Sequence, residues 1–246
     1  MFPPVIGSVI AQYGWRSGFL ALAALAALGL LPALLGLPGR QNAGREAEAE
    51  AASAFAGVRR SRLYLVQLAA FSTMALAFAG MLSHFVPMLG DAGMPIAQAG
   101  ALAGLIGVSV IVTRVIVGWL ADRMEPAWLG AASCALCGAG CLALALGGVP
   151  LAPVGAIALG AAMGAEADLL GILTARNFPL AAYSRAYAWQ YAAFMLAGGV
   201  SPLWIGYLAD STGGYRVPLL IVSAGLLVPI ALFLRLPSIG RSKAPD

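Results

Sequence analysis

Seven apolar runs, each long enough to cross a lipid bilayer, constrain the fold of this chain more than any other feature. A membrane-spanning helix needs about 20 mostly apolar residues, and each run reaches that length. The sequence therefore predicts an all-α polytopic membrane protein. The predicted spans are residues 17–37, 63–87, 95–120, 127–147, 151–175, 183–208 and 216–236.

The composition agrees with this prediction. The chain is 61% hydrophobic and 10% charged, whereas a soluble domain usually carries about 25% charged residues. Residues 1–13 are also apolar, but as a helix they would reach only about 20 Å, which is too short to span. The N-terminus lacks a basic segment and a small-residue cleavage site, so we expect no cleavable signal peptide.

Three cysteines, Cys134, Cys137 and Cys141, lie on one helical face of a single apolar run. Their odd number and shared helix argue against a disulfide framework. A metal site would place thiolates in hydrocarbon without a neighbouring cation. We therefore expect small hydrophobic side chains in a packed helix, and neither a metal nor another cofactor.

The basic residues are distributed unevenly between the two sides, and this asymmetry predicts the orientation of the chain, because positively charged loops remain cytoplasmic. One side carries eleven of them and the other only Arg16 and Arg216. We expect the linker 38–62 and the tail 237–246 to be cytoplasmic, in a bacterial inner membrane. The asymmetry also explains the net charge of +4 without nucleic-acid binding. The eleven residues are Arg40, Arg45, Arg59, Arg60, Arg62, Arg123, Arg176, Arg185, Arg235, Arg241 and Lys243.

The linker 38–62 is the one long polar segment. It includes Arg45–Glu50, in which glutamates alternate with alanines after the arginine. Such a segment can form a short surface helix or remain a solvated tether, and the sequence leaves both open.

One arginine, Arg114, lies inside the apolar run at 95–120. A guanidinium in hydrocarbon costs several kcal/mol, and even lenient insertion scales give about 2.5–3.5. A chain keeps such a group where it faces a watery cavity, a partner charge or an anionic ligand. The planar fork of arginine can hold a carboxylate through two parallel hydrogen bonds. The alternatives are a structural ion pair or a side chain that reaches back to the interface.

Two pairs of similar segments within the sequence, which we call echoes, predict a repeated architecture. The segment Gly118–Asp122 recurs as Gly206–Asp210 with a single change, Trp to Tyr. The first copy ends a span that runs inward and the second ends one that runs outward, which predicts an inverted three-plus-three repeat of 63–147 and 151–236. A second echo relates residues 3–16 to residues 202–216, since a Gly-aromatic-Arg turn opens the next helix in each.

On these features the chain resembles the major facilitator superfamily. Gly118–Arg123 is similar to the loop motif of that family, a glycine four residues before an Asp-Arg pair, although Met124–Pro126 departs from the basic continuation. The resemblance implies a gating role for Gly118, Asp122 and Arg123. It also implies a division of the chain into the end of an N-terminal half (1–37, the end of helix 5 and helix 6), a linker (38–62), a C-terminal six-helix domain (63–236) and a tail (237–246).

Further features are similar to the monocarboxylate transporter and oxalate–formate antiporter branch. They include Arg114 four residues before Gly118, the acidic segment Gly164–Asp168, and Tyr183 with Tyr187. In that branch the arginine binds the substrate carboxylate. The resemblance implies that Arg114 binds a carboxylate here.

On the predicted span 183–208, Trp189–Tyr191 stands where some relatives carry a lysine. We expect Gln190 and Tyr191 to contact the substrate. The missing second cation makes a dicarboxylate a poorer candidate than a monocarboxylate.

Two acidic residues, Glu166 and Asp168, lie at a depth comparable to that of Arg114. Residues two apart on a helix point about 200° apart, so the two cannot face one spot. We expect one to pair with Arg114 or a backbone donor and the other to carry a proton, with Glu166 as the coupling residue. The alternative is that both are structural partners. His84, the only histidine, is expected to be an interfacial residue without such a role.

The sequence therefore predicts a secondary transporter of small organic anions that works by alternating access, with or without proton symport. Its partners would be the substrate, the lipid, and a second six-helix half or a second copy of the chain. The alternatives are a truncated, non-transporting fragment or subunit, and a drug–proton antiporter. An enzyme is not expected, because the sequence has no intramembrane nucleophile, aspartyl pair or zinc motif.

Overall fold

A computed structural model describes residues 13–36 and 45–237, which form two compact units divided between Ala47 and Glu48. Most of the predicted echo at 3–16 and nearly all of the predicted tail lie outside the described residues. The first unit contains α2 (Trp15–Gly36), which coincides with the predicted span 17–37. Gly14 precedes α2 with a φ of +80°, a conformation that glycine adopts without strain.

The linker contains a helix, α3 (Arg45–Val58). This settles the choice between a surface helix and a solvated tether for that part of the linker. The ring of Phe55 packs edge-on against Tyr64, with ring centroids 5.8 Å apart, and Tyr64 in turn packs against Phe178 at 5.7 Å. Within the second unit, these aromatic contacts attach the end of α3 to the residues near Tyr64 and Phe178.

The second unit confirms the other six predicted spans, with ends displaced by four residues or fewer. Each of the six helical segments is long and apolar enough to cross a membrane. The predicted span at 17–37 is not among these six, because the apolar stretch in the described part of α2, Arg16–Leu28, is shorter than a span. The elements are α4 (Arg62–Asp91), α5 (Ile96–Ala121), α6 (Pro126–Gly147), the 3₁₀ turn η1 (Val149–Leu151), α7 (Ala152–Asn177), α8 (Leu180–Thr212), α9 (Arg216–Gly225) and α10 (Leu227–Leu234).

The last span is interrupted at Leu226, which separates α9 from α10. Pro229 explains the interruption. It has no N–H to donate to the carbonyl of Gly225, and its ring crowds that carbonyl. Nevertheless, the two helices together fill one span, Arg216–Leu234.

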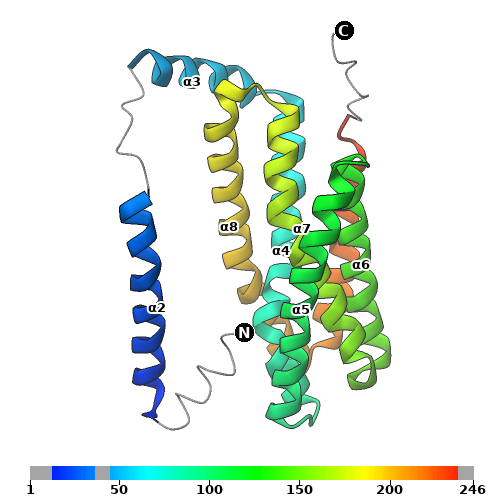
Figure 1. Cartoon of the computed structure of the whole chain (residues 1–246). Coiled ribbons are helices and arrows are strands. Elements are labelled where there is room, and N and C mark those ends of the chain that lie inside the picture. Colours follow the sequence, from blue (N-terminus) through cyan, green and yellow to red (C-terminus); the bar gives the residue numbers. More distant parts are fainter. Residues whose placement is uncertain (1–12, 37–44, 238–246) are drawn as a thin grey trace. The chain divides into compact units, whose positions relative to one another are not determined.

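Consecutive spans of the second unit run antiparallel (Figure 1). We call the end where α4, α6 and α8 begin the basic end, because Arg59, Arg60 and Arg62 lie there. Arg123, Arg176 and Arg235 lie at the same end, where α5, α7 and α10 finish. The other end is called the opposite end.

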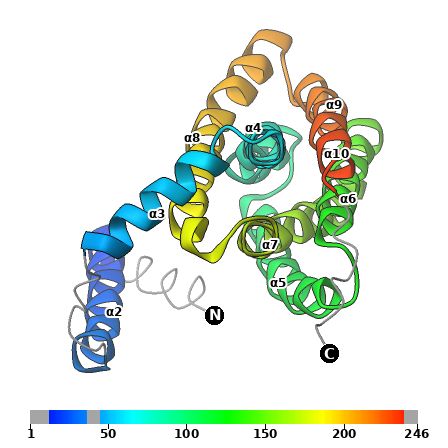
Figure 2. The same cartoon turned by 90° about the horizontal axis from the view of Figure 1, so that it is seen from above.

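The helix contacts have the symmetry of an inverted repeat. In this repeat α4 is equivalent to α7, α5 to α8, and α6 to α9–α10. The extensive contact between α4 and α8 then corresponds to that between α7 and α5, and the contact between α6 and α7 corresponds to that between α9–α10 and α4. The contact of α6 with α9 and α10 maps onto itself. In Figure 2, α5 and α8 accordingly occupy comparable outer positions. This pattern confirms the predicted pairing of two helix triplets.

Glycines bring the backbones of the paired helices close together. A Cβ on Gly80 of α4 would lie 2.7 Å from the backbone of Ser201 and Pro202 on α8. In the other pair, a Cβ on Gly164 of α7 would lie 2.6 Å from the carbonyl oxygen of Val110 on α5. Only a residue without a side chain fits at either place.

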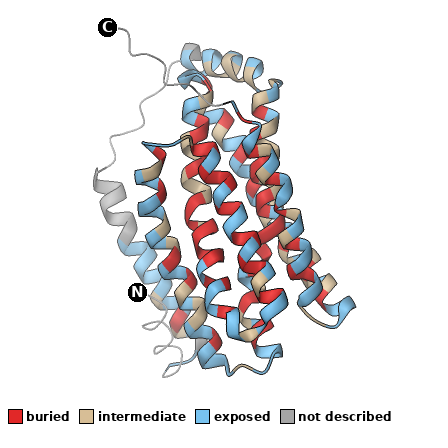
Figure 3. Cartoon of the chain, turned by 90° about the vertical axis from the view of Figure 1, so that its right-hand side faces the viewer, coloured by how far each residue is buried: buried red, intermediate tan, exposed pale blue. Residues whose placement is uncertain are grey.

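Among the six spans of the second unit, α5 and α8 are the least buried. Only 17% and 22% of their apolar cores are buried within the unit, against 50–61% for α4, α6 and α7. Buried residues run along the inner faces of the helices, as Figure 3 shows. The exposed faces of α5 and α8 include large apolar side chains such as Val115 and Leu196. These faces are available to lipid, to substrate or to another protein segment.

We predict that Gly164→Ala destabilises the second unit, whereas Gly104→Ala does not. The new methyl group at position 164 would meet backbone atoms of α5, and overpacking of this kind costs about 1–3 kcal/mol. Gly104 is the matched control, because a Cβ there meets nothing within 4 Å and alanine favours helix. Thermal unfolding in detergent measures both. A Gly164→Ala midpoint at or above that of Gly104→Ala would contradict the close packing of α5 on α7.

Candidate functional site

Arg114 lies on the exposed face of α5, near one large apolar side chain of the same face, Ile111. Among the described residues, its guanidinium makes no salt bridge within 4 Å and no hydrogen bond. Such a cation within a membrane span remains available for an anion. The structural ion pair considered from the sequence is therefore not formed within this unit.

Glu166 is the acidic residue that interacts electrostatically with Arg114. It lies on α7 within electrostatic range of Arg114 on α5, and of Cys134 and Cys137 on α6. One carboxyl oxygen, Oε2, is buried without a hydrogen-bond partner among the described residues. An unpartnered polar atom in an apolar environment is costly, so this carboxyl group can respond to any water, proton or ligand that reaches it.

Asp168 faces a different neighbour, as the 200° between residues two apart requires. It acts electrostatically on Tyr187 of α8. Tyr187 stacks between Tyr183 and Tyr191, with ring centroids 5.9 and 5.7 Å apart and the planes inclined by 20° and 12°. The three rings, spaced four residues apart along α8, make a ladder beside the acidic segment of α7. We refer to these three residues as the tyrosine ladder.

Gln190 and Tyr191 lie on different faces of α8. Tyr191 is 38% exposed and belongs to the tyrosine ladder, whereas Gln190 is fully buried. Neither the Oε1 nor the Nε2 atom of Gln190 has a hydrogen-bond partner among the described residues. Gln190 therefore keeps a complete amide available inside the bundle.

Gly118 and Asp122 are exposed at the basic end. Arg123 is held there locally, since its guanidinium lies 4.0 Å from the ring centre of Trp119 and donates a 2.9 Å hydrogen bond to the Trp119 carbonyl. Arg176 of α7 donates a 2.7 Å hydrogen bond to the carbonyl of Ala121, the last residue of α5. A cation at a helix C-terminus is stabilising, so Arg176 ties the end of α7 to this segment.

Sequence reasoning underestimated His84. Its Nε2 atom lies 3.0 Å from the carbonyl oxygen of Pro202, and its Nδ1 atom lies 3.0 Å from the hydroxyl of Tyr215. A carbonyl oxygen can only accept, so Nε2 carries the proton, and in the neutral ring Nδ1 accepts from the tyrosine. His84 thus joins α4, α8 and the turn before α9.

The inverted repeat would have identified this position. His84 lies four residues after the contact glycine Gly80, just as Asp168 lies four residues after Gly164. In the same way, Pro202 lies four residues before Gly206, as Arg114 does before Gly118. The His84–Pro202 contact therefore occupies the position in one triplet pair that Asp168 and Arg114 occupy in the other.

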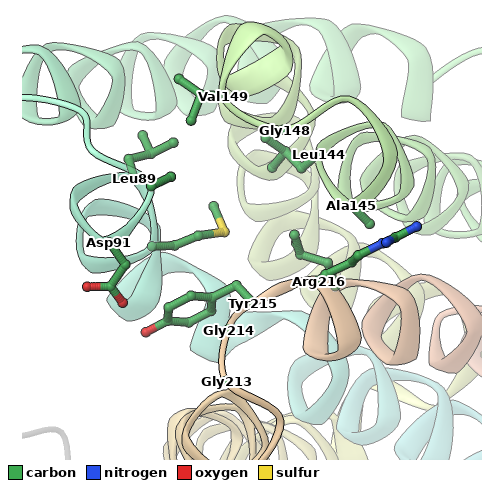
Figure 4. A pocket seen from close by; sticks show the side chains of 13 residues that line it. Leu89, Asp91, Leu144, Ala145, Gly148, Val149, Gly213, Gly214, Tyr215 and Arg216 are labelled. Carbon is green, nitrogen blue, oxygen red and sulfur yellow. The ribbon is translucent and has the colours of Figure 1, made fainter.

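A cavity of about 300 Å³ lies at the opposite end, next to Tyr215. The side chains of Asp91 and Tyr215 point to one side of it and Arg216 extends to the other (Figure 4). None of the residues predicted to bind substrate lines this cavity. Within the described part of the chain, no cluster of three or more metal-ligating side chains is present.

Comparisons with known proteins agree with this architecture. The sequence profile of the Major Facilitator Superfamily matches residues 1–168. One curated relative, the uncharacterized transporter YycB of Bacillus subtilis (strain 168), is 26% identical over 219 residues, which are 87% of this chain and 53% of the relative.

Two crystal structures share the fold. That of the E. coli fucose:proton symporter FucP (N162A) matches with a TM-score of 0.67 and 18% identity, covering 93% of this chain and 55% of FucP. A second FucP structure, in the outward conformation, matches with a TM-score of 0.69 and 17% identity, over 91% and 54%. The chain thus spans about half the length of the relative and of the structures that it matches.

We predict an alkaline loss of stability that depends on Tyr215. Burial, and then the carboxylates of Asp91 and Asp210, raise the pKa of Tyr215 above its ordinary value of 10.0. Because the folded-state pKa is the higher one, the stabilisation is complete below pH 10 and is lost as the pH rises through the folded-state pKa. The phenolate can no longer donate to His84.

The measurement is the free energy of unfolding between pH 8 and 11 for Tyr215→Phe and for Tyr207→Phe. Tyr207 is the matched control, since its side chain is 73% exposed. Tyr207→Phe should keep the alkaline loss of the wild type and Tyr215→Phe should reduce it. Equal pH dependence in both variants would show that the ionisation of Tyr215 does not cause the alkaline loss of stability.

Proposed function

Because this chain belongs to the Major Facilitator Superfamily, a family of membrane transporters and not of enzymes, we propose that it forms the C-terminal half of a secondary transporter for a small organic anion. The substrate class is a monocarboxylate and the mechanism is alternating access. In this fold the substrate site lies between two six-helix halves. Arg114 would hold the carboxylate, with Tyr191 and Gln190 contributing further contacts.

The observation that carries this proposal is the state of Arg114. It lies on one of the two least buried spans of the second unit and has no ion-pair partner among the described residues. A desolvated carboxylate that accepts two hydrogen bonds from one guanidinium would compensate this cation. A lysine could supply the charge but not the paired geometry.

The exposed faces of α5 and α8 support the involvement of a second half. Large apolar residues such as Ile111 and Leu196, 66% and 72% exposed, lie on these faces. A second six-helix unit packed there would enclose Arg114 and the tyrosine ladder between the two halves. The exposed glycines of α5, including Gly104, would then allow close packing of the second half, whereas they have no such role within the six-helix unit.

Proton coupling is proposed for the acidic pair on α7. Glu166 interacts electrostatically with Arg114, and one of its carboxyl oxygens is buried with no hydrogen-bond partner among the described residues. If the carboxylate of the substrate binds the guanidinium, Arg114 no longer stabilises the negative charge of Glu166. Protonation of Glu166 then becomes more favourable. Substrate and proton would then enter together.

A second candidate, a drug–proton antiporter, is favoured by one observation. Asp168 lies beside the tyrosine ladder, and a carboxylate next to aromatic faces suits an organic cation. In this case Asp168 and Tyr187 would bind the substrate, and Arg114 would have a structural role. The two candidates differ in the sign of the charge that they transport.

We predict that Arg114→Lys reduces monocarboxylate uptake to background without preventing membrane insertion. Loss of a charged, two-bond contact costs about 1.5–3 kcal/mol, which is about tenfold to more than a hundredfold in binding. Uptake of labelled monocarboxylates into proteoliposomes measures the effect in the complete transporter. Arg185→Lys, an exposed arginine on α8, is the control and should transport normally.

Labelled lipophilic cations tested in parallel distinguish the second candidate. Cation transport that is lost in Asp168→Asn but kept in Arg114→Lys would replace the anion proposal. Normal monocarboxylate uptake by Arg114→Lys would remove the role assigned to this arginine.

We also predict that Glu166→Gln separates exchange from accumulation. The amide keeps the shape of the carboxyl group but carries no titratable proton. The variant should retain substrate exchange across the membrane and lose accumulation driven by an inward proton gradient. Proton-driven accumulation equal to that of the wild type would exclude Glu166 as the coupling residue.

A further inference from the structure

A cavity of about 440 Å³ opens at the basic end of the six-helix unit, apart from the residues assigned to transport. It is formed where the start of α4 meets the segment that follows α10, elements far apart in sequence that pack together. The lining residues are Arg62, Leu63, Val66, Arg235, Leu236 and Pro237.

The described residues give this cavity a positive charge. Arg62 and Arg235 both line it, and none of the described lining residues is acidic. Both arginines are exposed, and among the described residues neither makes a salt bridge or a side-chain hydrogen bond. Each of these two lining arginines carries five guanidinium N–H donors. Arginine binds phosphate groups through paired hydrogen bonds.

The remaining walls are apolar. Leu63 and Val66 are half-buried and Leu236 is buried. Because α4 begins and α10 ends at this cavity, it lies at a boundary between hydrocarbon and water. A ligand that fits must present an anionic group to the arginines and an apolar group to the leucines and the valine. A basic pocket between spans at such a boundary is typical of sites for anionic lipid headgroups.

We propose that this cavity binds the phosphate headgroup of an anionic phospholipid, with Arg62 and Arg235 on the phosphate and an acyl chain against Leu63 and Val66. A free phosphate ion would satisfy the arginines equally well, but it would leave the apolar walls unused. The lipid would link the first and last spans of the six-helix unit. This site is independent of the transported substrate.

The test is a titration of the full chain, delipidated in detergent, with dioleoylphosphatidylglycerol, followed by native mass spectrometry. Each arginine near an anionic lipid contributes about fivefold in affinity. The variant Arg62→Gln/Arg235→Gln should therefore bind this lipid about 25-fold more weakly. Arg60→Gln is the matched control, since Arg60 lies at the same end but does not line the cavity, and its affinity should be unchanged.

Three results would overturn the proposal. They are wild-type affinity in the double variant, equal affinity for dioleoylphosphatidylcholine, and displacement of the lipid by inorganic phosphate alone at similar concentration, which would assign the site to a soluble anion. Thermal unfolding in phosphatidylcholine checks that the variants are folded. If the double variant unfolds, the single variants Arg62→Gln and Arg235→Gln carry the test, with a loss of about fivefold expected in each.

Discussion

The fold depends on one constraint, the need of every polar group inside a bilayer for a partner. Where α4 and α7 approach each other, the need is met. Gln67 donates to Thr174 at 3.0 Å, Asn177 donates to Gln67 at 2.7 Å, and Thr174 donates to the carbonyl of Leu170 at 2.7 Å. This network joins the first helices of the two triplets without an unsatisfied atom on Gln67. It belongs to the scaffold.

The paired helices α4 and α8 follow the same principle through their backbones. Ser201 accepts a 2.8 Å hydrogen bond from the N–H of Gly80, while the indole of Trp204 donates a 2.9 Å hydrogen bond to the carbonyl of Leu76. In an undisturbed α-helix, the N–H of Gly80 would instead donate to the carbonyl of Leu76. In contrast, Arg114, Glu166 and Gln190 have polar atoms without partners among the described residues, and all three have roles in the proposed transport mechanism.

Most of the fold could be predicted from the sequence because the bilayer dictates helix length and apolar content. The helix interruption within the last span was harder to predict. Pro229 gave a local reason for the interruption at Leu226, yet the division of one span into α9 and α10 was not predicted. Polar partners were harder still, because His84 reaches Tyr215 across 131 positions of sequence. The sequence around an isolated histidine near a helix end does not indicate such a partner. The alignment of the two repeats, in which His84 is equivalent to Asp168, does indicate that the position matters.

The central claim is that a carboxylate binds against Arg114 on the exposed face of α5. The most direct measurement is the alkylation rate of an Ile111→Cys variant in proteoliposomes, since Ile111 lies one turn from Arg114 and is 66% exposed. The native cysteines are buried and should react slowly. We predict that a short monocarboxylate slows alkylation and that its uncharged amide does not. Equal rates with the acid, with the amide and without ligand would contradict it.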